Sequence, residues 1–63
     1  MISVTLPDGS VRETEPGTVE EILARLGQNP YEILAAAEGE LLLADDFVED
    51  GANLLLTSIV HGG

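Results

Sequence analysis

The sequence contains no cysteine, no lysine and no tryptophan, and only one histidine. The absence of cysteine excludes disulfides, thiolate metal sites and cysteine nucleophiles, and the lone His61 cannot form a histidine metal cluster. The absence of lysine removes every side-chain amine, so the chain offers none for Schiff-base chemistry or for isopeptide linkage to itself. With no covalent or metal crosslink, a domain of 63 residues must be held together by the packing of its core.

Positive charge is also scarce, because twelve acidic residues face only Arg12 and Arg25 and give a net charge of −10. Such a charge repels nucleic acid and anionic membranes and favours a basic protein surface as partner, although solubility alone would also explain it. No apolar run approaches the roughly 18 residues of a membrane span, and the N-terminus lacks the layout of a signal peptide. These features predict a cytoplasmic protein that contacts neither nucleic acid nor membrane.

The first third of the sequence predicts a hairpin followed by a helix. Ile2 to Leu6 alternates apolar and polar residues as a half-buried strand does, "PDGS" supplies a turn, and Val11 to Glu15 returns as a polar edge strand. In "PGTVEEILARLG", Thr18 is placed to cap a helix and Glu21 to complete a capping box. The predicted helix has an apolar stripe made of Val19, Ile22, Leu23 and Leu26.

The middle of the sequence allows two interpretations. Asn29, Pro30 and Glu32 are typical of a helix start, whereas the apolar runs on either side of "EGE" fit a hairpin, so residues 33–43 are open between helix and strand. Asp45 and Asp46 then indicate a break, and "EDGAN" a turn. Leu54 to Val60 reads as a buried central strand that is apolar on both faces.

The residues form no recognisable catalytic or metal-binding constellation. The carboxylate pairs Asp45–Asp46 and Glu49–Asp50 lack EF-hand spacing, and no glycine-rich phosphate loop or nucleophile and base pair is present. His61 could act as a proton shuttle or could be an exposed histidine without a chemical role. A chain this small has little room for an active-site pocket, so we expect a carrier or substrate that is not an enzyme and binds no cofactor or metal itself.

The order of predicted elements and the "EDGANLLLTSIVHGG" finish resemble the ThiS/MoaD family of ubiquitin-like sulfur carriers and the small archaeal modifier proteins. The resemblance covers the whole chain and implies an α+β, ubiquitin-like β-grasp fold, with a mixed sheet of four to five strands packed on one helix. It implies a domain over residues 1–60 and a flexible diglycine tail over residues 61–63. It also favours a strand at Ile33 to Ala37.

The resemblance further implies that a ubiquitin-activating-type enzyme adenylates the Gly63 carboxylate with ATP, while His61 and Gly62 thread into that enzyme. The adenylate would become a thiocarboxylate that passes sulfur to an acceptor enzyme of thiamine, molybdopterin or tRNA thiolation, or would be captured by lysines of target proteins. A rival interpretation is a β-grasp interaction module that is never conjugated. Leu55, Thr57 and Ile59 are candidate partner-docking residues, and plain core packing is the alternative for them.

Overall fold

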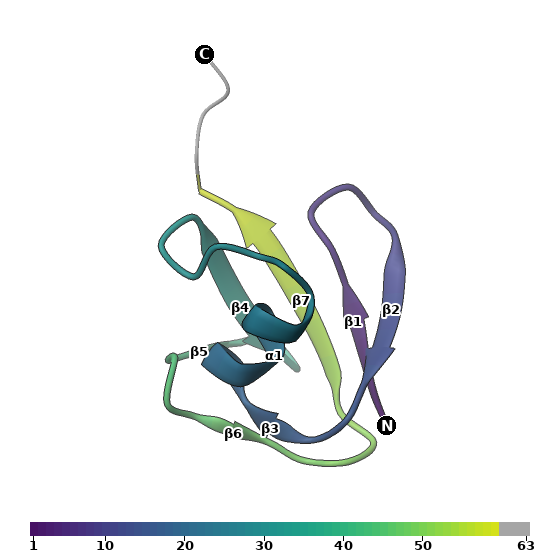
Figure 1. Ribbon diagram of the computed structural model, residues 1–63. Coiled ribbons are helices and arrows are strands. Elements are labelled where there is room, and N and C mark those ends of the chain that lie inside the picture. Colours follow the sequence, from purple (N-terminus) through teal and green to yellow (C-terminus); the bar gives the residue numbers. More distant parts are fainter. Residues whose placement is uncertain (60–63) are drawn as a thin grey trace.

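The computed structural model describes residues 1–59, which form an α+β domain with one helix (Figure 1). The elements in chain order are β1 (Ile2–Thr5), β2 (Val11–Thr14), β3 (Gly17–Thr18), α1 (Val19–Arg25), β4 (Ile33–Ala37), β5 (Glu40–Leu42), β6 (Phe47–Val48) and β7 (Asn53–Ser58). Five strands form one sheet in the order β2-β1-β7-β4-β5, and β3 pairs with β6 in a separate two-stranded sheet. Helix α1 lies across one side of the large sheet (Figure 1).

The large sheet is mixed, because β1 and β7 run parallel and the other neighbouring strands run antiparallel. The last strand, β7, therefore lies at the centre, between the first strand and β4. The prediction of a mixed sheet of four to five strands on one helix is confirmed. Strands β3 and β6 were not predicted, since an element of two residues is too short to show a periodic pattern.

The first hairpin forms where alternation and turn residues predict it. Ile2 and Val4 are completely buried, as one face of a half-buried strand requires. Gly9 has a φ of +91°, a left-handed conformation that a glycine adopts without a steric penalty. Strand β2 lies at the edge of the sheet, and only Thr14 of its four residues is buried, so the predicted polar edge strand is confirmed.

Helix α1 begins with the predicted capping box. The backbone N–H of Glu21 donates to the Thr18 hydroxyl at 3.2 Å, and Glu21 Oε1 accepts from the Thr18 backbone N–H at 2.9 Å. These two bonds satisfy amides that a helix start leaves without partners. The helix buries Val19, Ile22 and Leu23 against the sheet and ends before Gly27, whose φ is +70°.

The capping box gives a first prediction for stability. We expect Thr18→Ala to lower the free energy of unfolding by about 1 kcal/mol, because the Glu21 amide then loses its side-chain acceptor. Urea denaturation followed by circular dichroism measures this change. Thr18→Ser, which keeps the hydroxyl, is the matched control and should retain most of the stability; an equal loss in both variants would contradict the capping role.

The ambiguous segment after the helix forms strands, and the helix alternative for residues 33–43 is wrong. The helix-start residues form a single turn, in which Asn29 Oδ1 accepts from the Tyr31 N–H and the Asn29 carbonyl accepts from the Glu32 N–H. The chain then enters β4, which pairs with β7 on one side and with β5 on the other. Glu38 and Gly39 both have positive φ values, 51° and 81°, which suit a two-residue hairpin turn. Ile33 to Ala37 is therefore a strand.

Strand β7 requires one correction to the sequence analysis. The predicted strand at Leu54 to Val60 begins one residue earlier and ends at Ser58, and Val60 lies outside the described residues. Its central position is confirmed, but burial on both faces is wrong: Leu54 and Leu56 are 2% and 1% exposed, whereas Leu55 is 51% exposed. The reason is that the single helix covers only one face of the sheet.

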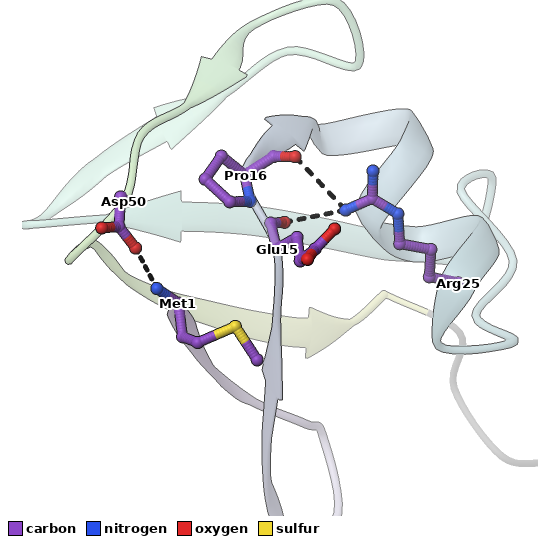
Figure 2. A network of polar contacts seen from close by, with 5 residues as sticks. All are labelled: Met1, Glu15, Pro16, Arg25 and Asp50. Carbon is purple, nitrogen blue, oxygen red and sulfur yellow. Dashed lines mark hydrogen bonds and ion pairs between the residues drawn. The ribbon is translucent and has the colours of Figure 1, made fainter.

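Two sets of polar contacts join the ends of elements to neighbouring segments (Figure 2). Arg25 reaches back from the end of α1, and its Nη1 donates to the carbonyl of Glu15 at 2.7 Å and more weakly to that of Pro16 at 3.4 Å. The amino group of Met1 forms an ion pair with Asp50 in the turn before β7. The first contact holds the connection from β2 to β3, and the second holds the start of β1 beside the start of β7.

Candidate functional site: the open face of the sheet and the root of the tail

The C-terminal residues singled out in the sequence follow directly from the central strand. His61, Gly62 and Gly63, with Val60, lie outside the described residues. The last described residue, Ile59, donates its backbone N–H to the carbonyl of Glu32 at 2.9 Å. The chain is therefore hydrogen-bonded to the segment before β4 up to the fifth residue from the end of the sequence. We call this point, Ile59 with Glu32, the root of the tail.

Two of the three candidate docking residues, Leu55 and Thr57, lie on the face of the sheet that α1 does not cover, which we call the open face, and the third, Ile59, directly follows β7. Leu55 is 51% exposed, Ile59 is 47% exposed, and Thr57 is also exposed. Core packing, the alternative that the sequence allowed for them, is therefore wrong. The core takes the intervening residues of β7, Leu54 and Leu56, which pack with α1 in one cluster.

The strand register shows what else lies on the open face. Residues paired across neighbouring strands share a face of the sheet, so the partners of Leu55 extend its row in both directions. Leu55 pairs with Thr5 of β1 and Ala36 of β4, Thr5 pairs with Val11, and Ala36 pairs with Leu41. This row crosses all five strands, and its two outermost residues, Val11 and Leu41, are 62% and 69% exposed.

The two sides of the open face differ in polarity, as a second row of paired residues shows. Thr57 pairs with Leu34 of β4, which is 43% exposed. The half over β7, β4 and β5 therefore presents mainly apolar side chains, and we call it the apolar half: Leu34, Ala36, Leu41, Leu55 and Thr57. On β1 and β2 the same face carries Ser3, Thr5 and Glu13 beside Val11, so that half is mainly polar.

The sequence could not have identified Leu34 and Leu41 as part of this surface. Both are leucines in short apolar runs, and such runs do not show which residues face the helix. Their position follows from the pairing of β4 with β7 and β5, which is decided by contacts between residues far apart in the chain. The one signal available was the glycine of "EGE", Gly39, which can adopt the positive φ of a hairpin turn if residues 33–43 are taken as strands.

Three exposed carboxylates in the described part of the chain have lowered pKa values. The Ser10 hydroxyl and amide donate to Asp8, and the Thr18 amide and hydroxyl donate to Glu21, which lowers the pKa of each carboxyl below its ordinary value. The Met1 amino group, which donates to Asp50 and pairs with its charge, lowers the pKa of that carboxyl. None of these three groups lies on the apolar half; they fasten a turn, a helix start and a chain end.

The lowered pKa of Glu21 predicts a pH dependence of stability. Because its pKa is lower in the folded than in the unfolded chain, ionised Glu21 stabilises the fold above its ordinary pKa of 4.5, and this contribution is lost as the pH falls through the folded-state value. We therefore expect wild type to exceed Glu21→Gln in stability at pH 7 and the difference to shrink below pH 4.5. Urea titrations at several pH values measure it; a difference that stays constant from neutral to acid pH would contradict the assignment.

The described residues offer no other obvious site. Among residues 1–59, no group of three or more metal-ligating side chains comes together, and no pocket opens in the surface. The one helix in this range, α1, has seven residues and is not long and apolar enough to cross a membrane. The open face and the root of the tail are thus the features on which a function can be argued.

Comparison with known proteins adds no further constraint. The chain matches no model of a known protein family, and no curated protein matches it in sequence.

Proposed function

We propose that this chain is a ubiquitin-like sulfur carrier of the ThiS/MoaD kind, whose Gly63 carboxylate is adenylated by a ubiquitin-activating-type enzyme and converted to a thiocarboxylate. The observation that carries the proposal is the position of β7: the central strand of the sheet, hydrogen-bonded through Ile59, leads into a sequence that finishes in Gly62 and Gly63. A folded domain followed by two glycines suits a protein that a partner enzyme recognises through the domain and modifies at the C-terminal carboxylate.

The arrangement of elements supports a β-grasp assignment within the α+β class. A first hairpin, β1 and β2, is followed by a helix that packs on the sheet, and the last strand returns to lie parallel to the first at the centre. Strands β4 and β5 complete the other side of the sheet. This is the element order that the resemblance to ubiquitin-like carriers implies, and it extends over the whole described chain.

The proposed chemistry places few demands on the carrier itself. One oxygen of the Gly63 carboxylate attacks the α-phosphorus of ATP, pyrophosphate leaves, and the product is an acyl adenylate. A sulfur donor then displaces AMP at the carbonyl carbon, which leaves a thiocarboxylate for a sulfur-accepting enzyme of thiamine, molybdopterin or tRNA thiolation. Glycines suit the approach, because residues without a Cβ can pass through a narrow channel in backbone conformations that other residues avoid. ATP is bound by the partner, in the cytoplasm, and the carrier holds no cofactor.

The adenylate has a second possible fate, conjugation to other proteins. If the amine of a target lysine attacks the activated carbonyl, AMP leaves and an isopeptide bond forms, so the carrier becomes a protein modifier. Because the chain contains no lysine, such a modifier would be attached singly and could not extend lysine-linked chains on itself. A third possibility, an interaction module that is never conjugated, is favoured only by the exposed apolar residues of the open face.

Intact-mass spectrometry of the protein isolated from its native cells tests the proposal. We expect a fraction in which the mass rises by the replacement of one oxygen by sulfur, located by sequencing of the C-terminal peptide. Branched peptides joining Gly63 to lysines of other proteins would establish the modifier instead. A plain carboxylate without conjugates, in cells deprived of sulfur-transfer products, would favour the interaction module.

A further inference from the structure

We infer that the apolar half of the open face docks a different protein through a contact surface that is apolar at its centre and ringed by lysine and arginine. The inference names the chemistry of the partner of the proposed carrier, but it does not depend on any reaction at Gly63. It is carried by two observations: the exposure of leucines on one half of the open face, and the absence of cations from that part of the chain.

The exposed leucines are concentrated on one half of the open face. Leu34, Leu41 and Leu55 are 43%, 69% and 51% exposed, and the register places them on neighbouring strands of one face. Leu43, one residue past β5, is 70% exposed. Single exposed leucines are common on protein surfaces, whereas several on adjacent strands form the contiguous patch that is typical of an interaction site.

The charge around this patch has one sign. Both arginines precede residue 26, and residues 26–59 contain seven carboxylates and no arginine or lysine: Glu32, Glu38, Glu40, Asp45, Asp46, Glu49 and Asp50. Glu32 precedes β4, Glu38 lies in the turn before β5, Glu40 begins β5, and Asp45 follows it. All four of these residues are exposed. The apolar half is therefore bordered by carboxylates at the ends of its strands.

This charge selects among the possible occupants. A second copy of the chain would bring two such acidic borders together, which costs free energy through like-charge repulsion. A partner that places basic groups opposite the border gains both attraction and a faster encounter. The polar half of the open face presents Glu13 beside Val11, whereas Arg12 of β2 pairs with buried Val4 and so lies on the other face of the sheet.

The surface also reaches the root of the tail. Tyr31 is 89% exposed, and its backbone N–H donates to Asn29 Oδ1. Tyr31 directly precedes Glu32, whose carbonyl accepts the hydrogen bond from Ile59. Tyrosine is among the residues that contribute most to binding energy at protein interfaces. Tyr31 is thus an exposed aromatic residue next to the root of the tail.

Site-specific photo-crosslinking in the native cells tests the inference, with matched positions at the two ends of one row. A photoreactive amino acid replaces Leu41 in one variant and Val11 in the other, because both are outermost in the same row and similarly exposed. We expect position 41 to crosslink to another protein at least about tenfold more than position 11, and the attached peptide to carry apolar residues beside lysine or arginine. The yield in cell extract should fall as salt is raised, because screening weakens the attraction.

Three results would overturn the inference: crosslinks from position 41 to a second copy of the chain, equal yields from both positions, or no crosslink at all. The same crosslinking experiment in a variant that lacks Gly62 and Gly63 separates the docking inference from the proposed function. Docking should persist in this variant, while any thiocarboxylate is lost. As a second measurement, Leu41→Ser should lower crosslinking from position 55 by about tenfold, whereas Val11→Ser should leave it nearly unchanged. Both substitutions are at exposed positions, so the fold should be retained.

Discussion

Deletion of Gly62 and Gly63 is expected to abolish formation of any thiocarboxylate or conjugate while leaving the domain folded. An extended chain spans at most about 3.6 Å per residue, so the deletion withdraws the terminal carboxylate by roughly 7 Å. Because a misplacement of about 1 Å can cost about a hundredfold in rate, no detectable adenylation should remain. The measurement is ATP–pyrophosphate exchange with the activating enzyme of the same cells, together with the intact mass of the product.

Two controls accompany the deletion. All strands of the large sheet lie within residues 2–58, so circular dichroism and urea unfolding of the deletion variant should match those of wild type. His61→Ala keeps both glycines and the length of the chain, and we expect it to be adenylated within a few-fold of wild type. Strong loss in His61→Ala alone would point to a proton-transfer role for this histidine, and full activity of the deletion variant would refute the carrier function.

Replacement of Leu56 by alanine is expected to bring the domain close to unfolding. Leu56 is 1% exposed in the core cluster, and removing a leucine from a core costs about 2–5 kcal/mol. A domain of this size rarely has more than about 3–5 kcal/mol of stability, so a large fraction of Leu56→Ala should be unfolded without denaturant. Circular dichroism in buffer and a urea titration measure this loss.

Leu55→Ala is the matched control, because it removes the same atoms from the neighbouring residue on the open face. At 51% exposure, Leu55 should contribute little to the core, and the variant should lie within about 0.5 kcal/mol of wild type. The same variant should nevertheless weaken docking on the apolar half. Similar loss of stability in both variants would show that the open face is packed against something within the chain, contrary to the structure.

The local elements of this domain were predictable wherever the signal lies within a few residues. The alternation around Ile2 and Val4, the turn that contains Gly9 and the capping box of Thr18 and Glu21 all depend on neighbours close in the chain. Each of these predictions is confirmed. The same local reasoning could not decide between helix and strand for residues 33–43, because helix-start residues and a strand-forming run follow one another there, and only pairing with β7 and β5 selects the strand.

The docking surface was predictable only in part. The sequence indicated the last apolar run and named Leu55, Thr57 and Ile59, but it could not distinguish docking from burial. It gave no reason to include Leu34 or Leu41, since these residues join the surface through strand register. It also gave no reason to exclude Val11 from the apolar half, which depends on the order of strands in the sheet.

The sequence by itself determined which chemical groups this protein has and where its amphipathic helix lies: no thiol or side-chain amine, a net charge of −10, one amphipathic helix and two glycines at the end. These properties belong to residues or to short segments, so no fold is needed to establish them. The tertiary structure alone decided which face of β7 is open, because seven-residue α1 can cover only one side of a five-stranded sheet. For that reason Leu54 and Leu56 are buried and Leu55 is exposed. The central strand, which the sequence shows as apolar throughout, contributes alternate residues to the core and to the surface.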